Sequence, residues 1–273
     1  MAPQWCVQAP VVGVATTLDD YAQWVLHPQL PERPTQPHSS YFICGTPRSG
    51  SWLLCGLLAS TGIAGRPHEW FWRDTEQANC RAWGVSRFSD YVARVRDAGT
   101  TPNGVFGSKL MWVYLDELLA RLRELGDSAS HRSVIERHFA NPRFVWIWRE
   151  DVTAQAVSWA KAIQTGRWHH WNATDPSAVL VYDREQIEAL ADEVVESNAR
   201  WRTWFAANEI QPLAVRFEDL VADKIAPTCE VLEFLGLASE CIAVAERTIK
   251  TSDHTNEEWL GRYRAHASEG RLG

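Results

Sequence analysis

Four short apolar runs alternate along the chain with longer segments of helical spacing. The runs cover residues 40–44, 105–108, 143–148 and 213–217, and the longest helical segment extends from about 184 to 208. Nearly continuous apolar strands separated by helices are typical of a parallel sheet that is covered on both faces. The pattern therefore predicts an α/β fold, with a parallel sheet flanked by helices on both faces.

The first 38 residues do not follow this alternation. A short segment of helical pattern is followed by a proline-rich stretch, residues 28–37, which leads into the body of the chain. We interpret residues 1–38 as a docked arm or linker without chemistry of its own, and residues 39–273 as a single domain. A chain of 273 residues is long enough for one α/β domain of this kind.

Composition and charge narrow the classes of partner. The formal net charge is −7, so we expect no general attraction to nucleic acid or to an anionic membrane. There is no run of about 18 apolar residues, which excludes an evident membrane span. The N-terminus has no basic segment followed by an apolar stretch, so a signal peptide is not expected. The six cysteines are scattered without a C-x-x-C pair, which favours reduced thiols in the cytoplasm.

A glycine-containing loop joins the first predicted strand to the helix that follows. It reads Gly45-Thr46-Pro47-Arg48-Ser49-Gly50-Ser51-Trp52. Backbone N–H groups at such a strand–helix junction attract anions. A nucleotide triphosphatase would continue after the last glycine with Lys and then Ser or Thr, whereas here the cation, Arg48, lies inside the loop. We therefore favour an anion site over the alternative, an ordinary strand–helix turn.

The end of the third predicted strand suggests a second anion site. In metal-dependent P-loop enzymes an Asp at such a position helps to hold Mg²⁺, but here the residue is Arg149. Arg149 can hold a phosphate group, and Ser158 in the following helix is expected to face the same edge of the sheet. The alternative is an ion pair of Arg149 with Glu150 or Asp151, and a Ser158 on the helix surface.

No metal site is predicted. The His169–His170 pair has no third ligand at a useful spacing, so a loop is the better interpretation. Two anion sites without a set of metal ligands fit a donor that carries phosphate groups at two positions and transfers a group without Mg²⁺.

These motifs resemble those of sulfotransferases that use 3′-phosphoadenosine 5′-phosphosulfate (PAPS). Residues 46–52 are similar to their 5′-phosphosulfate loop, and Arg149 with Ser158 is similar to their 3′-phosphate site. A narrower likeness, to the actinobacterial trehalose 2-sulfotransferase family, is carried by residues 65–71, 101–112, 155–158 with 164–165, and 258–259 with 262–264.

The resemblance implies a P-loop-type, sulfotransferase-like fold with PAPS as donor and adenosine 3′,5′-bisphosphate as product. The donor-binding residues would be Thr46, Pro47, Arg48, Ser49, Gly50, Ser51, Trp52, Arg149 and Ser158. It also implies a homodimer whose partner helps to shape the acceptor site. Residues 73–100 and 167–183 depart from the family pattern and are expected to face the acceptor.

Glu69 is the candidate general base, because the acceptor hydroxyl must lose its proton as it attacks. The helix after the loop would carry the chain about 15 Å away from the loop. The next eight or so residues can span about 25 Å, enough to return Glu69 to it. The resemblance also implies a glutamate base at this position. The alternatives are a surface glutamate in a proline-containing turn, and His68 as a weaker base that more simply packs.

Three further sets of residues complete the prediction. Arg48 would neutralise charge on the oxygens of the transferred group. Lys109 would bind donor or acceptor, or pair with a carboxylate. Trp52, Trp70 and Trp112 are candidate walls for adenine or a sugar ring.

The sequence thus predicts a sulfotransferase that acts, without a metal, on a hydroxyl of a small, sugar-like molecule. One alternative is a metal-dependent P-loop kinase, which would need a Lys after Gly50 and an acidic end to the third strand. The other is a nucleotide-binding module without catalysis, for which Glu69 would be dispensable.

Overall fold

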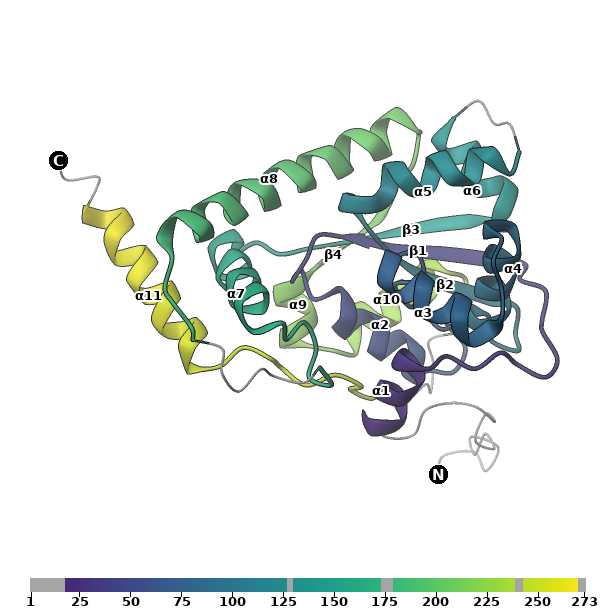
Figure 1. The fold of residues 1–273 in the computed structure, drawn as a ribbon, viewed down its shortest axis with the longest axis horizontal. Helices are drawn as coiled ribbons and strands as arrows, with labels where there is room; N and C mark the ends of the chain where they lie inside the picture. Colours follow the sequence, from purple (N-terminus) through teal and green to yellow (C-terminus); the bar gives the residue numbers. More distant parts are fainter. Residues whose placement is uncertain (1–17, 127–129, 173–178, 239–242, 270–273) are drawn as a thin grey trace, which may run out of the picture.

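The computed structural model describes residues 18–126, 130–172, 179–238 and 243–269. In these residues four strands form one parallel sheet in the order β2-β1-β3-β4 (Figure 1). The strands are β1 (Ser39–Gly45), β2 (Val105–Met111), β3 (Pro142–Trp148) and β4 (Leu213–Arg216). β1 and β3 are the central pair. The strand that leads into the glycine loop therefore lies beside the strand that is followed by Arg149.

Helices cover both faces of the sheet, as predicted. Alternate residues of β1 point to opposite sides, Phe42 into one apolar cluster and Ile43 into the other. The first cluster is closed by α3 (Arg73–Trp83), α4 (Phe88–Gly99), α5 (Trp112–Glu124), α6 (His131–His138) and α8 (Arg184–Ala207). The second is closed by α2 (Ser51–Ser60), α9 (Phe217–Ala222) and α10 (Ala226–Phe234).

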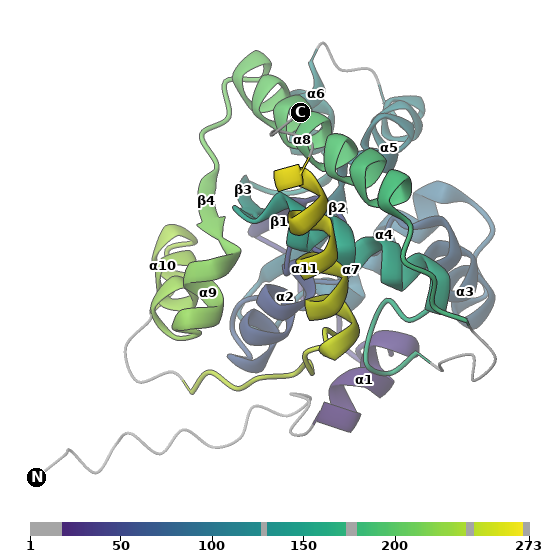
Figure 2. The same cartoon turned by 90° about the vertical axis from the view of Figure 1, so that its left-hand side faces the viewer.

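A third apolar cluster lies where α7 (Val152–Thr165) packs between α8 and α11 (His254–Glu269) (Figure 2). Local sequence signals set the ends of α7. The Asp151 side chain accepts a hydrogen bond from the N–H of Ala154 (2.9 Å), and Gly166 ends the helix with φ 65°. Since β3 ends at Trp148, α7 begins just beyond the carboxyl end of that strand.

The structure extends β2 beyond the expected residues 105–108, so Lys109 lies inside the strand rather than after it. The apolar pattern stops at Lys109 because a charged residue seldom occupies a buried strand. Here its ammonium group has a carboxylate partner, Glu69, which allows the strand to continue to Met111.

Part of the expected arm is docked on the body. The helix α1 (Leu18–Leu26) buries Tyr21, Ala22 and Val25, and it lies beside the loop that follows α7 in both views (Figures 1 and 2). Residues 1–17 lie outside the described residues.

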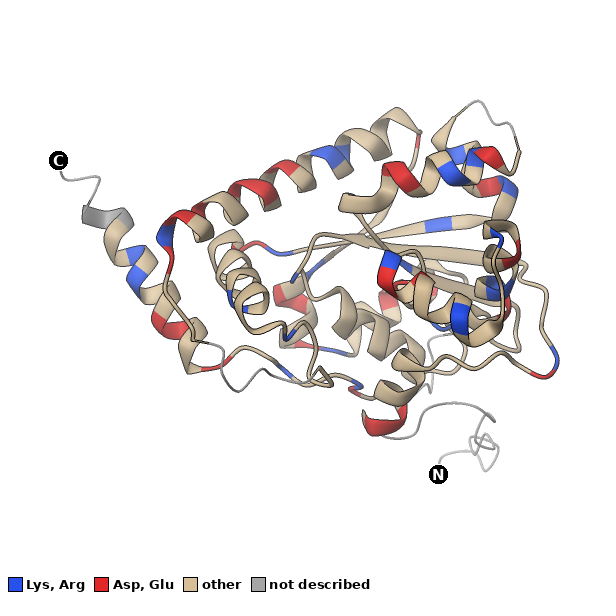
Figure 3. Ribbon diagram, viewed as in Figure 1, with Lys and Arg blue, Asp and Glu red and all other residues tan. Residues whose placement is uncertain are grey.

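Charge and thiols follow simple patterns. Acidic residues recur along α8, which also carries basic residues, and both kinds of charge are scattered over the other elements (Figure 3). Cys44, Cys55, Cys80 and Cys229 are free thiols, and Cys6 and Cys241 fall outside the described ranges. Within the described part of the chain no helix is long and apolar enough to span a bilayer.

Candidate active site

The glycine loop is a tightly packed turn between β1 and α2. Arg48 and Gly50 both have left-handed backbone conformations, with φ 64° and 89°. A Cβ at Gly50 would lie 2.3 Å from the Phe217 ring, and one at Gly45 would lie 2.9 Å from the Ser49 hydroxyl. A side chain at Gly50 would displace the Phe217 ring and strain the left-handed backbone, so glycine is needed there and keeps the turn tight.

Two side chains from distant helices hold this loop. The Gln155 amide donates hydrogen bonds to Thr46 Oγ1 (2.8 Å) and to the Pro47 carbonyl (2.6 Å). The Trp201 indole donates to the Gly45 carbonyl (3.0 Å). Gln155 appeared in the sequence only within a family-like segment, and nothing in the sequence pattern pointed to Trp201.

The Ser49 hydroxyl, by contrast, is buried and has no hydrogen-bond partner among the described residues. A buried polar group of this kind normally has a partner, and an anion in the loop would supply one. The neighbouring Ser51 is also buried and opens α2, at the helix end that favours negative charge. The loop therefore fits an anionic ligand.

Arg48 is held only by neutral oxygen atoms. Its Nε donates to Ser158 Oγ (3.0 Å), and its other nitrogens donate to the Trp168 carbonyl and to Thr251 Oγ1. No carboxylate pairs with it in the described part of the chain. Burial, and to a smaller degree the charge of Arg149, lowers the pKa of Arg48 to about 10. The guanidinium group is thus still charged at neutral pH and lacks a counter-charge.

A pocket of about 140 Å³ adjoins Arg48 between α7 and the segment before α11. Its polar lining includes Arg48, Ser158, Lys161, Arg167, Thr251 and Asn256. The pocket has more cationic than anionic groups, because Asp253 is the one carboxylate in its lining and pairs with Lys161 (2.6 Å).

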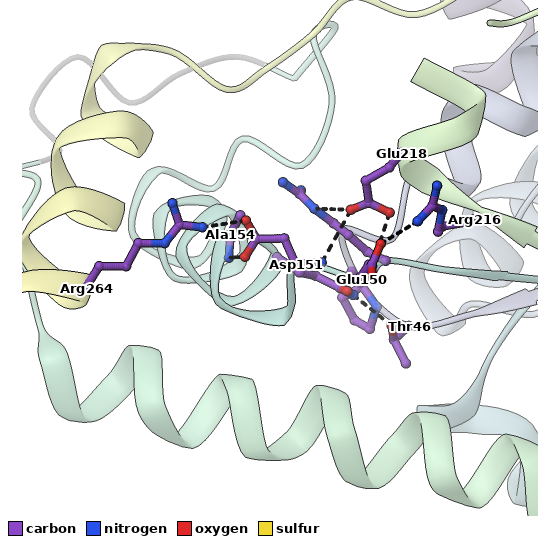
Figure 4. A network of polar contacts seen from close by, with 10 residues as sticks. Thr46, Glu150, Asp151, Ala154, Arg216, Glu218 and Arg264 are labelled. Carbon is purple, nitrogen blue, oxygen red and sulfur yellow. Dashed lines mark hydrogen bonds and ion pairs between the residues drawn. The ribbon is translucent and has the colours of Figure 1, made fainter. Parts of the chain in front are cut away.

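Arg149 has a different environment, because it lies near Glu218, whose polar contacts are drawn in Figure 4. Its guanidinium group lies 4.7 Å from the centre of the Phe217 ring, and its Nε is 3.8 Å from Glu218 Oε1. Glu218 also accepts hydrogen bonds from the N–H groups of Glu150 (3.2 Å) and Asp151 (3.4 Å). The partner of Arg149 is therefore Glu218, and not the adjacent Glu150 or Asp151 that we considered from the sequence.

Burial lowers the pKa of Arg149, and the charges of Asp151 and Glu218 oppose that shift. Its Nε is buried and makes no hydrogen bond among the described residues, since its nearest carboxylate oxygen, on Glu218, is 3.8 Å away. Ser158, the other predicted 3′-phosphate residue, accepts a hydrogen bond from Arg48 Nε (3.0 Å).

Glu69 returns to the carboxyl edge of the sheet, as the chain-length argument requires. The N–H of Lys109 donates to the His68 carbonyl (2.9 Å), which holds this segment beside β2. Lys109 Nζ lies 2.5 Å from Glu69 Oε2, with the two side chains only 2% and 16% exposed. Lys109 Nζ also lies 5.0 Å from the centre of the Trp52 ring. The pair thus lies next to the last residue of the glycine loop.

The three tryptophans that were predicted to line the site lie in different environments. Trp70 is fully buried and its indole donates to the Gly107 carbonyl (3.1 Å), so it is a core residue and cannot line an open site. Trp52 and Trp112 are half-buried at the carboxyl edge. The Trp112 ring packs edge-on against Trp201 (5.2 Å), which in turn holds the glycine loop.

The loop after α7 also enters the site. The His169 ring lies 4.8 Å from Trp52 and stacks on Trp171 (4.7 Å). Burial, followed by the charges of Lys109 and Arg48, lowers the pKa of His169 well below its ordinary value. His169 is therefore a neutral ring beside both cations, and no three potential metal ligands gather anywhere in the described residues.

Comparison with known proteins identifies the family. Residues 40–266 match the model of the Stf0 sulphotransferases. The chain belongs to this sulfotransferase family. It is 32% identical over 260 residues to the trehalose 2-sulfotransferase of Mycobacterium tuberculosis, covering 85% of this chain and 96% of that protein. It is 28% identical over 266 residues to that of Mycolicibacterium smegmatis, covering 86% and 97%.

A solved structure, the sulfotransferase domain of the Synechococcus PCC 7002 olefin synthase, is similar at 16% identity and a TM-score of 0.45, covering 87% of this chain and 90% of that one. The family match confirms the predicted resemblance and makes the chain an enzyme, a sulfotransferase. The family assignment excludes the two alternative interpretations of the sequence, a metal-dependent P-loop kinase and a nucleotide-binding module without catalysis.

Proposed function

We propose that this sulfotransferase transfers a sulfuryl group from PAPS to a hydroxyl of a sugar or glycosylated metabolite. The observation that carries the proposal is the buried Glu69–Lys109 pair beside the glycine loop, at the carboxyl edge of a parallel sheet. The sugar acceptor is supported by the two curated relatives, both named trehalose 2-sulfotransferase.

The residues present fit a donor with two anionic ends. In the loop, Arg48 has no carboxylate partner among the described residues and the buried Ser49 hydroxyl lacks a hydrogen bond. Arg149, which follows the end of β3, supplies a second cation at the same edge of the sheet. We assign residues 46–52 to the phosphosulfate, and Arg149 with Ser158 to the 3′-phosphate. The placement of Arg149 where a metal-dependent enzyme would have an acidic residue supports transfer without a metal.

In the proposed reaction the acceptor oxygen attacks sulfur. A new oxygen–sulfur bond forms, and the bond between sulfur and the bridging oxygen breaks, leaving its electron pair on the phosphate. The hydroxyl proton passes to the Glu69 carboxylate. Because charge develops on peripheral and bridging oxygens, a cation at Arg48 favours the transition state. Lys109 pairs with Glu69 and holds the carboxylate in place before the acceptor arrives.

The test uses PAPS labelled in its sulfuryl group and a panel of mono- and disaccharides, with EDTA present. We expect label in at least one sugar, and a product heavier by one sulfuryl group by mass spectrometry. Glu69→Gln should lower kcat by about 10²–10⁴-fold, the usual contribution of a general base, with donor affinity unchanged. Absence of transfer to every hydroxyl acceptor, or an unchanged kcat in Glu69→Gln, would overturn the proposal.

The homodimer and the cytoplasmic location implied by the sequence stay predictions. Light scattering on the purified full chain tests the first, and fractionation of cells that express it tests the second.

A further inference from the structure

The helix α1 lies outside the family match, which begins at residue 40, yet it contacts the segment that carries Glu69. The point of contact is His68, which is 2% exposed. Its Nε2 donates a hydrogen bond to the carbonyl oxygen of Val25, the last buried residue of α1, at 2.7 Å. A segment that we interpreted as an arm without chemistry thus reaches the residue next to the proposed base.

The His68 ring is fixed from several sides. It stacks on Trp70 at 4.7 Å, and its edges meet Trp52 at 5.4 Å and Trp24 of α1 at 5.7 Å. Its own carbonyl accepts the hydrogen bond from the Lys109 N–H. The ring therefore joins α1, the end of the glycine loop and strand β2, and all three meet within one residue of Glu69.

The chemistry of this ring leaves it one role. Burial, aided by the charge of Lys109, lowers the pKa of His68 to about 4, so the ring is neutral at neutral pH. A carbonyl oxygen only accepts, so the proton of the neutral ring must be on Nε2, facing Val25. Nδ1 is buried and has no partner among the described residues. The ring N–H of His68 is therefore used in the hydrogen bond to α1, and the ring is unsuited to take the proton of the acceptor hydroxyl.

We propose that His68 is a positioning residue for Glu69 and that α1, through the Val25 carbonyl, is part of the active site. This inference rests on the proposed role of Glu69 as base. Glu69 is carried by residues 64–70, which form neither helix nor strand, so their path depends on contacts with neighbours. Small displacements of a reacting group are costly: about 1 Å of misplacement can reduce a rate by about 10²-fold.

The first test compares two substitutions of His68 in the full chain. Gln keeps an N–H donor at about the position of Nε2, whereas Phe keeps the stack on Trp70 but leaves the Val25 carbonyl unpaired. We expect His68→Phe to lower kcat by at least about tenfold, or 1.4 kcal/mol in activation free energy, and His68→Gln to restore it to within about threefold. The KM for the sugar and the affinity for adenosine 3′,5′-bisphosphate should change little.

The second test approaches the same contact from α1. Val25→Asp places a carboxylate on the buried face of the helix, and Gln23→Asp places the same charge on its exposed face. We expect the first to lower kcat as His68→Phe does, and the second to behave like the parent chain. All rates are measured well below each variant's unfolding temperature, so that loss of folded protein is not counted as loss of kcat.

The outcomes separate the two proposals. If Glu69→Gln is inactive but His68→Phe and Val25→Asp keep the parent kcat, the positioning role is wrong and the base stands. If Glu69→Gln keeps the parent kcat, the base itself is wrong. Equal losses in His68→Phe and His68→Gln would also contradict the inference, because the hydrogen bond would then not be the feature that matters.

Discussion

Arg48 and Arg149 are two partly buried cations at the same edge of the sheet, but their partners differ in charge. Arg48 is surrounded by the neutral oxygens of Ser158, Thr251 and Trp168. Arg149 faces the carboxylate of Glu218 at 3.8 Å. Burial lowers the pKa of both arginines, but only for Arg149 do neighbouring carboxylates oppose the shift.

This difference indicates different roles for the two cations. A buried charge without a counter-charge gains most from an arriving anion, since nothing has to be displaced. Arg149 already has part of that gain from Glu218. We therefore expect Arg48 to act on the group whose charge changes during transfer, and Arg149 to contribute to donor affinity.

The largest effect should come from Arg48→Met, which removes the uncompensated charge and keeps the side-chain length. We expect kcat to fall by about 10²–10³-fold, as for the loss of one preorganised group that stabilises developing charge. The rate is measured by labelled transfer at saturating donor. Arg48→Lys is the matched control and should recover part of the rate, since it keeps the charge but not the three-way hydrogen bonding. A kcat of Arg48→Met within fivefold of the parent value would show that Arg48 does not have the separate role in transfer that we expect.

Gly50→Ala should disturb both sites together, because Phe217 touches Gly50 on one side and Arg149 on the other. The new Cβ would meet the ring at 2.3 Å, in addition to the strain of a left-handed backbone. Gly84→Ala is the control: its φ is 65° and nothing lies within 4 Å of the added atom.

The two alanine variants are compared by thermal unfolding and by titration with adenosine 3′,5′-bisphosphate. Gly84→Ala should cost about 1–2 kcal/mol of folding free energy, the usual penalty for a left-handed residue, with normal binding. Gly50→Ala should cost more and weaken binding. Equal stability and binding in both variants would mean that the contact between Gly50 and Phe217 contributes neither to folding nor to donor binding.

Arg149→Met should weaken donor binding by about 10–100-fold, as expected when a charge-assisted hydrogen bond worth about 1.5–3 kcal/mol is lost. At saturating donor, kcat should change by only a few-fold. Calorimetry with two ligands checks the assignment. Adenosine 3′,5′-bisphosphate should lose affinity, whereas adenosine 5′-phosphate, which lacks the 3′ group, should not. Equal losses for both ligands would place Arg149 elsewhere on the donor.

Glu218→Gln should have the smallest effect and the opposite sign. The amide oxygen can still accept from the N–H groups of Glu150 and Asp151, but the charge facing Arg149 is gone. We expect donor affinity to rise about two- to fivefold at low salt and less at high salt, since a partly exposed ion pair is well screened. Calorimetry at two ionic strengths measures this, and weaker binding would show that Glu218 supports the site.

The sequence predicted the elements better than their contacts. The strand and helix patterns identified the parallel sheet and the helices on both of its faces. Chain length allowed Glu69 to return to the sheet edge, where the structure has it beside Lys109, but its pairing with Lys109 was one of several alternatives. Trp70 was predicted as a wall and is a core residue, because an aromatic residue looks the same in the sequence whichever of these it forms.

By itself, then, the sequence determined the features that depend on near neighbours in the chain. These are the alternation of strands and helices, the position of the glycine loop between the first strand and the following helix, and the identity of the two cations. Their signals are local, since backbone periodicity, helix ends and glycine conformations involve a few consecutive residues.

Only the tertiary structure decided which groups meet. It paired Lys109 with Glu69, set Glu218 against Arg149, and brought Val25 of α1 to His68. Such contacts join residues far apart in the chain, and their free energy depends on distance and burial, which no local pattern records.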